Sequence, residues 1–432
     1  MFETIKNAVK NPDLRKKLLF TLFIIIIFRI GAAIPVPFLD ATVLKSLMGG
    51  ENSGNLLGYL DILTGGALSN ATLFAMSITP YINSSIIIQL LTVALPPLER
   101  LAKEGEEGRK KITKITRYVT VVLALIQAIA YYFLLRSQGA ILMDYRTGFM
   151  SIFAAVVIVA VFTAGAALLM WLGEQINEKG IGNGISIILF AGIISRAPKA
   201  AAYLWAMLMS GETKYYVYVP LVLVIFLAII TFIVIMTNAE RRIPVQYAKR
   251  VVGRKMYGGQ SSHIPIKVSM SGVMPIIFAS SLLSIPGVIV ALWNPAETNG
   301  FGNFLRMFNY DTWLYAVLYF LLIIAFNYFY IAIQYNPIEI ANNLKKNNGA
   351  IPGIRPGKPT SEFITKVISK ITFVGAIYLG LVAIFPILFG KFTGMNLALG
   401  GTSVLIIVGV ALDTMRSLES QMMMRHHKGF LE

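Results

Sequence analysis

The 432-residue sequence contains no cysteine and only three histidines, which removes two common kinds of site. Without cysteine there is neither a disulfide framework nor a thiolate metal site. The HExxH zinc motif and the GxxxxGK[ST] nucleotide loop are missing too. The sequence therefore predicts no resident metal, no cofactor and no nucleotide site, so the energy for any movement has to come from outside this chain.

Charged residues are also scarce, at 14% against about 25% in soluble globular domains. Hydrophobic residues make up 56% of the chain, which leaves too little polar surface to cover soluble domains of this total length. The same composition excludes intrinsic disorder, because disordered chains have low hydrophobicity and high net charge. A membrane protein is the class that remains.

Long apolar runs support that class. A helix crosses a bilayer core of about 30 Å with about 20 apolar residues. The runs in this chain are continuous and lack the period-two alternation of a membrane β-barrel. We predict an all-α polytopic protein with ten spans, at 18–34, 71–95, 115–135, 149–172, 184–209, 217–236, 268–293, 313–335, 367–389 and 397–412.

The positive charges give this arrangement an orientation. An even number of spans places both termini on the same side of the membrane. Of the 38 Lys and Arg residues, 29 lie in segments on that side, 8 lie on the opposite side, and Arg29 lies within a span. Because cytoplasmic loops carry the excess of positive charge, we predict that both termini are cytoplasmic.

Two long basic segments, 238–267 and 337–366, fall on the cytoplasmic side. In the first, apolar and polar residues alternate on either side of Gly258-Gly259, which predicts two short strands. One interpretation of the charge is topology retention together with affinity for anionic lipid. The alternative is docking of a partner with an acidic surface, which the length of the segments and their proline-glycine content favour.

Two spans share a faint pattern that divides the chain. Residues 78–88 and 273–283 each contain a proline followed by a pair of serines. We expect Pro80 and Pro275 each to disrupt a helical hydrogen bond. The two spans occupy equivalent places if the chain consists of two five-helix halves, 1–210 and 211–432. An odd number of helices per half would invert the second half in the membrane.

A short apolar segment, 58–68, precedes the second span and is too short to cross a bilayer. An interfacial helix lying on the membrane and a re-entrant segment surrounded by protein both fit it.

Within the spans, Asn83 and Gln127 are polar. They indicate either hydrogen bonds between helices or a polar patch in a wall that opens.

Carboxylates near the middle of a span are the usual signal of a proton- or sodium-coupled carrier, and the sequence shows none. A secondary small-solute carrier remains the alternative function, since inverted halves and broken helices fit it as well. An intramembrane enzyme is disfavoured because no nucleophile–base pair or metal triad is evident. The large basic loops favour a channel with a docked partner.

Long motifs distributed over the whole chain resemble the bacterial SecY family of protein-conducting channels. The motifs are FRIGAAIPVP (28–37), GGALSNATLFAMSITPYINSSIIIQLL (65–91), WLGEQINEKGIGNGISIILFAGI (171–193), RRIPVQYAKR (241–250), IPGIRPGKPT (351–360) and GGTSVLIIVGVALD (400–413). The resemblance implies a ten-helix clamshell of two inverted halves with a short plug helix, and a passive channel rather than an enzyme. That channel would translocate unfolded secretory polypeptides across the bacterial cytoplasmic membrane and release transmembrane segments laterally into lipid.

The resemblance also implies partners and site residues. The partners are SecE and usually SecG, the SecA motor ATPase, the ribosome, signal sequences and membrane lipid. The hydrophobic pore ring falls on Ile78, Ile82, Ile185, Leu189, Ile277 and Ile406. The plug, 58–68, includes Tyr59, Leu60, Ile62, Leu63, Gly65 and Gly66. The lateral gate includes Asn83, Ser84, Gln127, Ser280 and Ser281. The SecA and ribosome docking surface includes Arg241, Arg242, Lys249, Arg250, Arg254, Lys255 and Arg355.

Overall fold

The structure is a computed structural model that describes residues 10–49, 66–137, 139–145, 148–247, 250–252, 255–257, 261–293, 312–393 and 401–426. Helices occupy each of the ten predicted spans within these ranges. By length and composition, six of the described helices can cross a membrane, or seven if the bent pair α5–α6 is one span. The predicted all-α polytopic class is confirmed.

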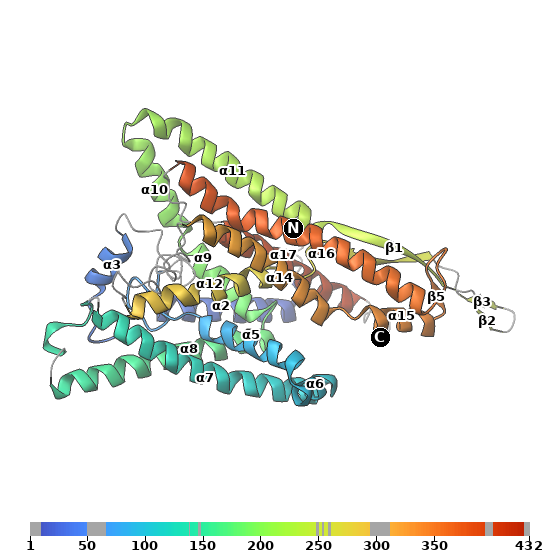
Figure 1. Ribbon diagram of the computed structural model, residues 1–432, viewed down its shortest axis with the longest axis horizontal. Helices are drawn as coiled ribbons and strands as arrows, with labels where there is room; N and C mark the ends of the chain where they lie inside the picture. Colours follow the sequence, from blue (N-terminus) through green and yellow to red (C-terminus); the bar gives the residue numbers. More distant parts are fainter. Residues whose placement is uncertain are drawn as a thin grey trace.

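The first part of the chain contains the helices drawn from blue to green in Figure 1. Its elements are α2 (Pro12–Gly31), α3 (Ala41–Gly49), α5 (Thr79–Ala94), α6 (Pro96–Lys103), α7 (Glu106–Ser137), η1 (Met143–Tyr145), α8 (Phe149–Lys179), α9 (Gly184–Ile194) and α10 (Ala197–Met209). The fifth predicted span is interrupted between α9 and α10, where Arg196 and Pro198 lie.

The second part packs its long helices beside the first along the same direction (Figure 1). Its helices are α11 (Thr213–Asn238), α12 (Met274–Trp293), α14 (Trp313–Gln334), α15 (Pro337–Lys346), α16 (Lys358–Thr393) and α17 (Gly401–His426). Within each part, α5 packs closely on α7, α7 on α8, α12 on α14 and α14 on α16. Many apolar side chains on the outer faces of these helices are exposed, as a lipid-facing surface requires.

A small sheet extends beyond the helices at one end of the molecule (Figure 1). Strand β1 (Glu240–Tyr247) pairs antiparallel with β4 (Ser261–Lys267) and with β5 (Gly349–Ala350). A separate hairpin is formed by β2 (Arg250–Val252) and β3 (Lys255–Tyr257). Alternate residues Ile243 and Val245 are buried against α15 and α16 residues such as Leu344 and Ile364. The two strands predicted from the alternating pattern are confirmed.

The helix of the second predicted span begins at Thr79, whereas the apolar run begins at 71. Residues 66–78 form turns instead, with positive φ at Ala71 and Ser77. Their backbone is paired inside the protein: the amide of Val36 donates to the carbonyl of Ala71 at 2.8 Å. Hydropathy alone could not separate this segment from a helix, because buried irregular backbone is tolerated at membrane depth when its polar groups are satisfied.

Two glycines allow the irregular segment to pack this closely. A Cβ at Gly31 of α2 would lie 2.0 Å from the ring of Phe74. A Cβ at Gly165 of α8 would lie 2.1 Å from the carbonyl oxygen of Leu73. Residues 66–78 are therefore wedged between α2 and α8, and the start of α5 has a fixed position.

The expectation that Pro80 and Pro275 disrupt helical hydrogen bonds is wrong. Pro80 is the second residue of α5 and Pro275 is the second residue of α12. In the first turn of a helix the missing N–H costs nothing, because that donor has no partner within the helix. Both prolines therefore start a helix after a non-helical segment, at 66–78 in one case and 268–273 in the other.

Candidate functional site

The six residues predicted for the pore ring lie in one apolar cluster. Ile78, Leu189 and Ile406 are buried in it, at 1%, 5% and 2% exposure. The partly buried members of the set, Ile82, Ile185 and Ile277, pack against them. These side chains come from α5 and its N-terminal flank, α9, α12 and α17, so segments more than 300 residues apart in sequence converge here.

The turn between α8 and α9 sets the position of Ile185 and Leu189. Asn183 is the N-cap of α9, and its side-chain oxygen accepts from the amides of Ile185 and Ser186 at 3.1 and 3.4 Å. Such a cap satisfies amides that have no partner inside the helix. The side-chain oxygen of Asn177 on α8 accepts from the amide of Gly184 at 2.8 Å. Residues 180–186 (GIGNGIS) therefore form a structural turn that directs α9 into the apolar cluster.

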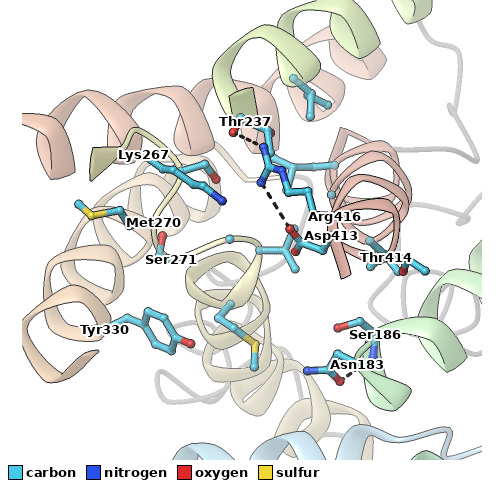
Figure 2. A pocket seen from close by; sticks show the side chains of 18 of the residues that line it. Asn183, Ser186, Thr237, Lys267, Met270, Ser271, Tyr330, Asp413, Thr414 and Arg416 are labelled. Carbon is cyan, nitrogen blue, oxygen red and sulfur yellow. Dashed lines mark hydrogen bonds and ion pairs between the residues drawn. The ribbon is translucent and has the colours of Figure 1, made fainter. Parts of the chain in front are cut away.

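A cavity of about 310 Å³ adjoins the cluster, and Val410 belongs to both. Figure 2 shows polar side chains entering it from several elements. Ser186 comes from α9, Thr237 from the end of α11, Lys267 from β4, and Asp413 from α17. The cavity is therefore a polar chamber directly beside the apolar cluster.

Arg416 of α17 makes two hydrogen bonds and one ion pair in this chamber. Its Nη2 donates to the carbonyl of Thr237 at 3.0 Å and to Oδ1 of Asn238 at 2.8 Å. Its Nη1 lies 3.7 Å from Oδ1 of Asp413. A cation is stabilised at the C-terminus of α11, where unpaired carbonyls and the helix dipole carry negative charge. The hydrogen bonds therefore attach α17 to the end of α11.

Two of the predicted gate residues, Ser84 and Ser280, make hydrogen bonds within their own parts of the chain. The hydroxyl of Ser84 on α5 donates to the carbonyl of Thr116 on α7 at 2.8 Å. The hydroxyl of Ser280 donates to the carbonyl of Ile277, one turn earlier on α12, at 2.9 Å. Asn83 and Gln127 are half-buried, on α5 and α7.

Ser271, just before α12, takes part in a similar link between helices of the second part of the chain. Its hydroxyl donates to Oδ1 of Asn327 on α14, and Nδ2 of Asn327 donates to the carbonyl of Thr372 on α16 at 2.9 Å. By contrast, α12 has only sparse contacts with α5 and α7. We call this boundary between α5–α7 and α12 the seam. The described hydrogen bonds of Ser84 and Ser271 strengthen the packing on either side of the seam without crossing it.

Sequence reasoning did not single out Asn327 or Arg416, whose hydrogen bonds connect separate helices around the cluster and the chamber. Asn327 is 1% exposed and is the single amide side chain between two long apolar stretches of α14. A lone polar residue in an apolar span is a signal that could have identified it. The partners of Arg416 lie 178 and 179 residues away in sequence, so no local pattern predicts them.

Only the end of the predicted plug lies within the described residues. Gly66 has a φ of 87°, and its carbonyl accepts from Asn70 Nδ2 at 2.7 Å and from Ser69 Oγ at 3.1 Å. The other predicted plug residues, Tyr59, Leu60, Ile62, Leu63 and Gly65, lie outside the described ranges.

The predicted docking residues lie on and beside the small sheet. Arg241 and Arg242 on β1 are exposed, and so is Arg355 in the turn before α16. Arg250 and Lys255 belong to the β2–β3 hairpin. Lys249 and Arg254 fall outside the described ranges. The described basic residues therefore lie on the elements that extend furthest from the membrane-spanning helices (Figure 1).

Comparison with known proteins gives a consistent result. A protein-family model named SecY matches residues 72–415. The chain is similar to "Protein translocase subunit SecY" of Streptomyces griseus, with 45% identity over 443 aligned residues and 100% of both chains covered. It is similar to the protein of the same name from Mycobacterium tuberculosis H37Rv, with 43% identity over 449 aligned residues and full coverage of both.

Two solved structures share the fold. One is described as "The structure of a protein conducting channel", with a TM-score of 0.66, 19% identity and 96% of both chains covered. The other is "Sec61 in the Canine ribosome-channel complex from the endoplasmic reticulum", with a TM-score of 0.63, 18% identity and 96% of both chains covered.

Proposed function

This chain belongs to the SecY family, and from that premise we propose that it is the pore subunit of a protein translocase. It is a multi-pass membrane channel protein that moves unfolded secretory polypeptides across a membrane and is not an enzyme. In bacteria that membrane is the cytoplasmic one, and both termini lie in the cytoplasm. The excess of Lys and Arg on the terminal side supports this orientation.

The observation that carries the proposal is the convergence of six branched apolar side chains beside a polar chamber. A narrow apolar constriction loses its water and is costly for a bare ion to enter. Branched apolar side chains also make no specific demand on a passing polypeptide. A ring of Ile78, Ile82, Ile185, Leu189, Ile277 and Ile406 would retain ions at rest and admit chains of varied sequence.

The seam supports a second part of the proposal, lateral release into lipid. A signal sequence is an apolar helix, and burying its apolar surface in lipid stabilises it by about 25 cal/mol per Å². Opening is least costly where contacts are sparse, and the contacts of α12 with α5 and α7 are sparse. We place the lateral gate at this seam, and we place its two walls in the inverted halves 1–210 and 211–432.

The remaining assignments follow from position. Residues 58–68 form the plug, and Gly66 is where it joins the fixed segment 66–78. The exposed arginines of β1 and Arg355 form the docking surface for the SecA motor or the ribosome. The related Sec61 structure is described as part of a ribosome–channel complex, which supports a ribosomal partner. SecE and SecG complete the assembly.

Reconstitution tests the proposal. The chain with its SecE and SecG partners is placed in sealed vesicles, and a secretory precursor, SecA and ATP are added. We expect the precursor to become resistant to added protease, and vesicles without the chain serve as the control. A carrier of small solutes would leave the precursor fully digested, and that result would contradict the proposal.

A further inference from the structure

The two ends of the β1–β4 hairpin and a pair of opposite charges on α17 line the same chamber. Thr237 and Asn238 end α11, one residue before β1, and Lys267 is the last residue of β4. Arg416 binds the first end through two hydrogen bonds of 3.0 and 2.8 Å. Figure 2 shows Lys267 extending into the same chamber that Asp413 enters.

The polar groups at the two ends of the hairpin differ in the sign of their charge. Each end lines the chamber together with a residue of α17 that has the opposite charge. Arg416 meets carbonyl and amide oxygens at the C-terminus of α11, where the helix dipole is negative. Lys267 and Asp413 both line the chamber beside Arg416. Asp413 and Arg416 are one turn apart on α17, with Nη1 and Oδ1 separated by 3.7 Å. A single turn of α17 therefore binds one end of the hairpin through Arg416 and shares the chamber with the other end through Asp413.

The backbone makes the hairpin base a rigid unit. The amide of Val268 donates to the carbonyl of Ala239 at 2.9 Å, which closes the hairpin where it leaves the helices. Strands β1 and β4 pair continuously from Glu240–Lys267 to Gln246–Ser261. This continuous pairing is the basis on which we expect a displacement of the exposed end of the hairpin to reach its base.

The other end of this connection is the apolar cluster. Ile406 lies ten residues before Arg416 on the continuous helix α17, about 15 Å away at 1.5 Å per residue. Packed helices transmit small displacements because they have few stable arrangements and low compressibility. Arg416 thus joins the base of the β1–β4 hairpin to α17, the helix that contributes Ile406 to the proposed ring.

We propose that Arg416, with Asp413 and Lys267, is a positioning latch that couples a partner docked on the β1–β4 hairpin to the pore ring through α17. This inference rests on the proposed function. The latch neither touches the translocating polypeptide nor forms the docking surface. Its role is to make movement of the hairpin move α17.

The test separates coupling from docking. In vesicles containing the complete complex, SecA affinity and precursor translocated per ATP hydrolysed are measured for Arg416→Gln and Lys267→Gln. We expect affinity to stay within about twofold while translocation per ATP falls about fivefold or more, the lower range for allosteric coupling. Arg416→Lys keeps the charge and is expected to recover part of the loss. Glu419→Gln, an exposed site one turn further along α17, is the control.

A structural readout completes the test, and the absence of native cysteine makes it simple. Spin labels at Gln246→Cys on β1 and Ser420→Cys on α17 report the hairpin–helix distance. We expect a narrow distribution in the parent chain and a broad one with Arg416→Gln. An unchanged distribution, or a loss of SecA affinity parallel to the loss of translocation, overturns the latch. If the parent complex translocates nothing, the proposed function fails instead.

Discussion

The hydroxyl of Ser84 on α5 donates a 2.8 Å hydrogen bond to the carbonyl of Thr116 on α7. This bond is buried, and it joins two helices that we assign to the same wall of the lateral gate. If the wall moves as a unit, the bond persists in both the closed and the open gate. Gate opening then separates α5 and α7 from α12 while the contact between α5 and α7 remains.

Replacement of Ser84 by alanine removes this connection. We expect Ser84→Ala to lower the free energy of unfolding by about 1 kcal/mol, the usual net value of one buried hydrogen bond. The effect is measured by denaturant titration of the detergent-solubilised protein. Ser85→Ala, at the adjacent half-buried position of α5, is the matched control. Equal effects of the two substitutions would show that the Ser84 bond has no particular importance.

The apolar ring is expected to be the ion barrier. Ile82→Ser and Ile277→Ser place a hydroxyl in the constriction, which favours water there and lowers the cost of ion entry. We expect a several-fold rise in ion conductance of reconstituted bilayers at rest. Ile87→Ser makes the same change on the exposed face of α5, where the side chain is 39% exposed. A leak of equal size from Ile87→Ser would place the barrier elsewhere.

Gly66 should control how the plug is seated. Its φ of 87° suits glycine, and an alanine there is strained by about 1 kcal/mol or more. We expect Gly66→Ala to increase resting ion conductance, as deletion of residues 58–68 should do more strongly. Gly105→Ala is matched to it in backbone strain, with a φ of 79°, but lies in the α6–α7 turn with open space around its Cβ position. No increase with Gly66→Ala and with the deletion would contradict the plug assignment.

Arg355 is expected to act in docking. The side chain is exposed, and the turn that carries it is held by Thr360 Oγ1, which donates to the Arg355 carbonyl at 2.8 Å. Arg355→Glu should abolish the stimulation of SecA ATPase by the channel while membrane insertion stays normal. Lys199→Glu reverses a charge on exposed α10, on the opposite side of the membrane in our orientation, and should change nothing. Normal stimulation by Arg355→Glu would remove the docking assignment.

Much of the fold could be predicted because a bilayer leaves few choices. Apolar runs of about 20 residues must become helices, and the alternating pattern in 242–247 must become a strand with buried Ile243 and Val245. The six residues that the resemblance assigns to the ring lie in one apolar cluster, and their role as a pore ring stays a prediction. The segment 66–78 could not be predicted, because its composition is as apolar as a helix and its shape depends on contacts with Gly31 and Gly165.

Long-range polar links were the other limit. Asn327 connects Ser271 to Thr372 across three separate segments, and Arg416 connects α17 to the end of α11. Such pairs depend on how helices far apart in sequence come together, so a single sequence does not specify them. A proline in an apolar run was equally ambiguous, since it can bend a helix or begin one. In this chain Pro80 and Pro275 begin one.

The path of the polypeptide tests the central claim most directly. A secretory precursor is stalled during translocation in vesicles, and a photoreactive residue is placed in turn at Ile82, at Ile277 and, as controls, at the lipid-exposed positions Leu22 and Val224. We predict crosslinks to the precursor from Ile82 and Ile277 and crosslinks only to lipid from Leu22 and Val224. Crosslinks from the lipid-exposed positions, with none from Ile82 and Ile277, would contradict a pore through the apolar ring.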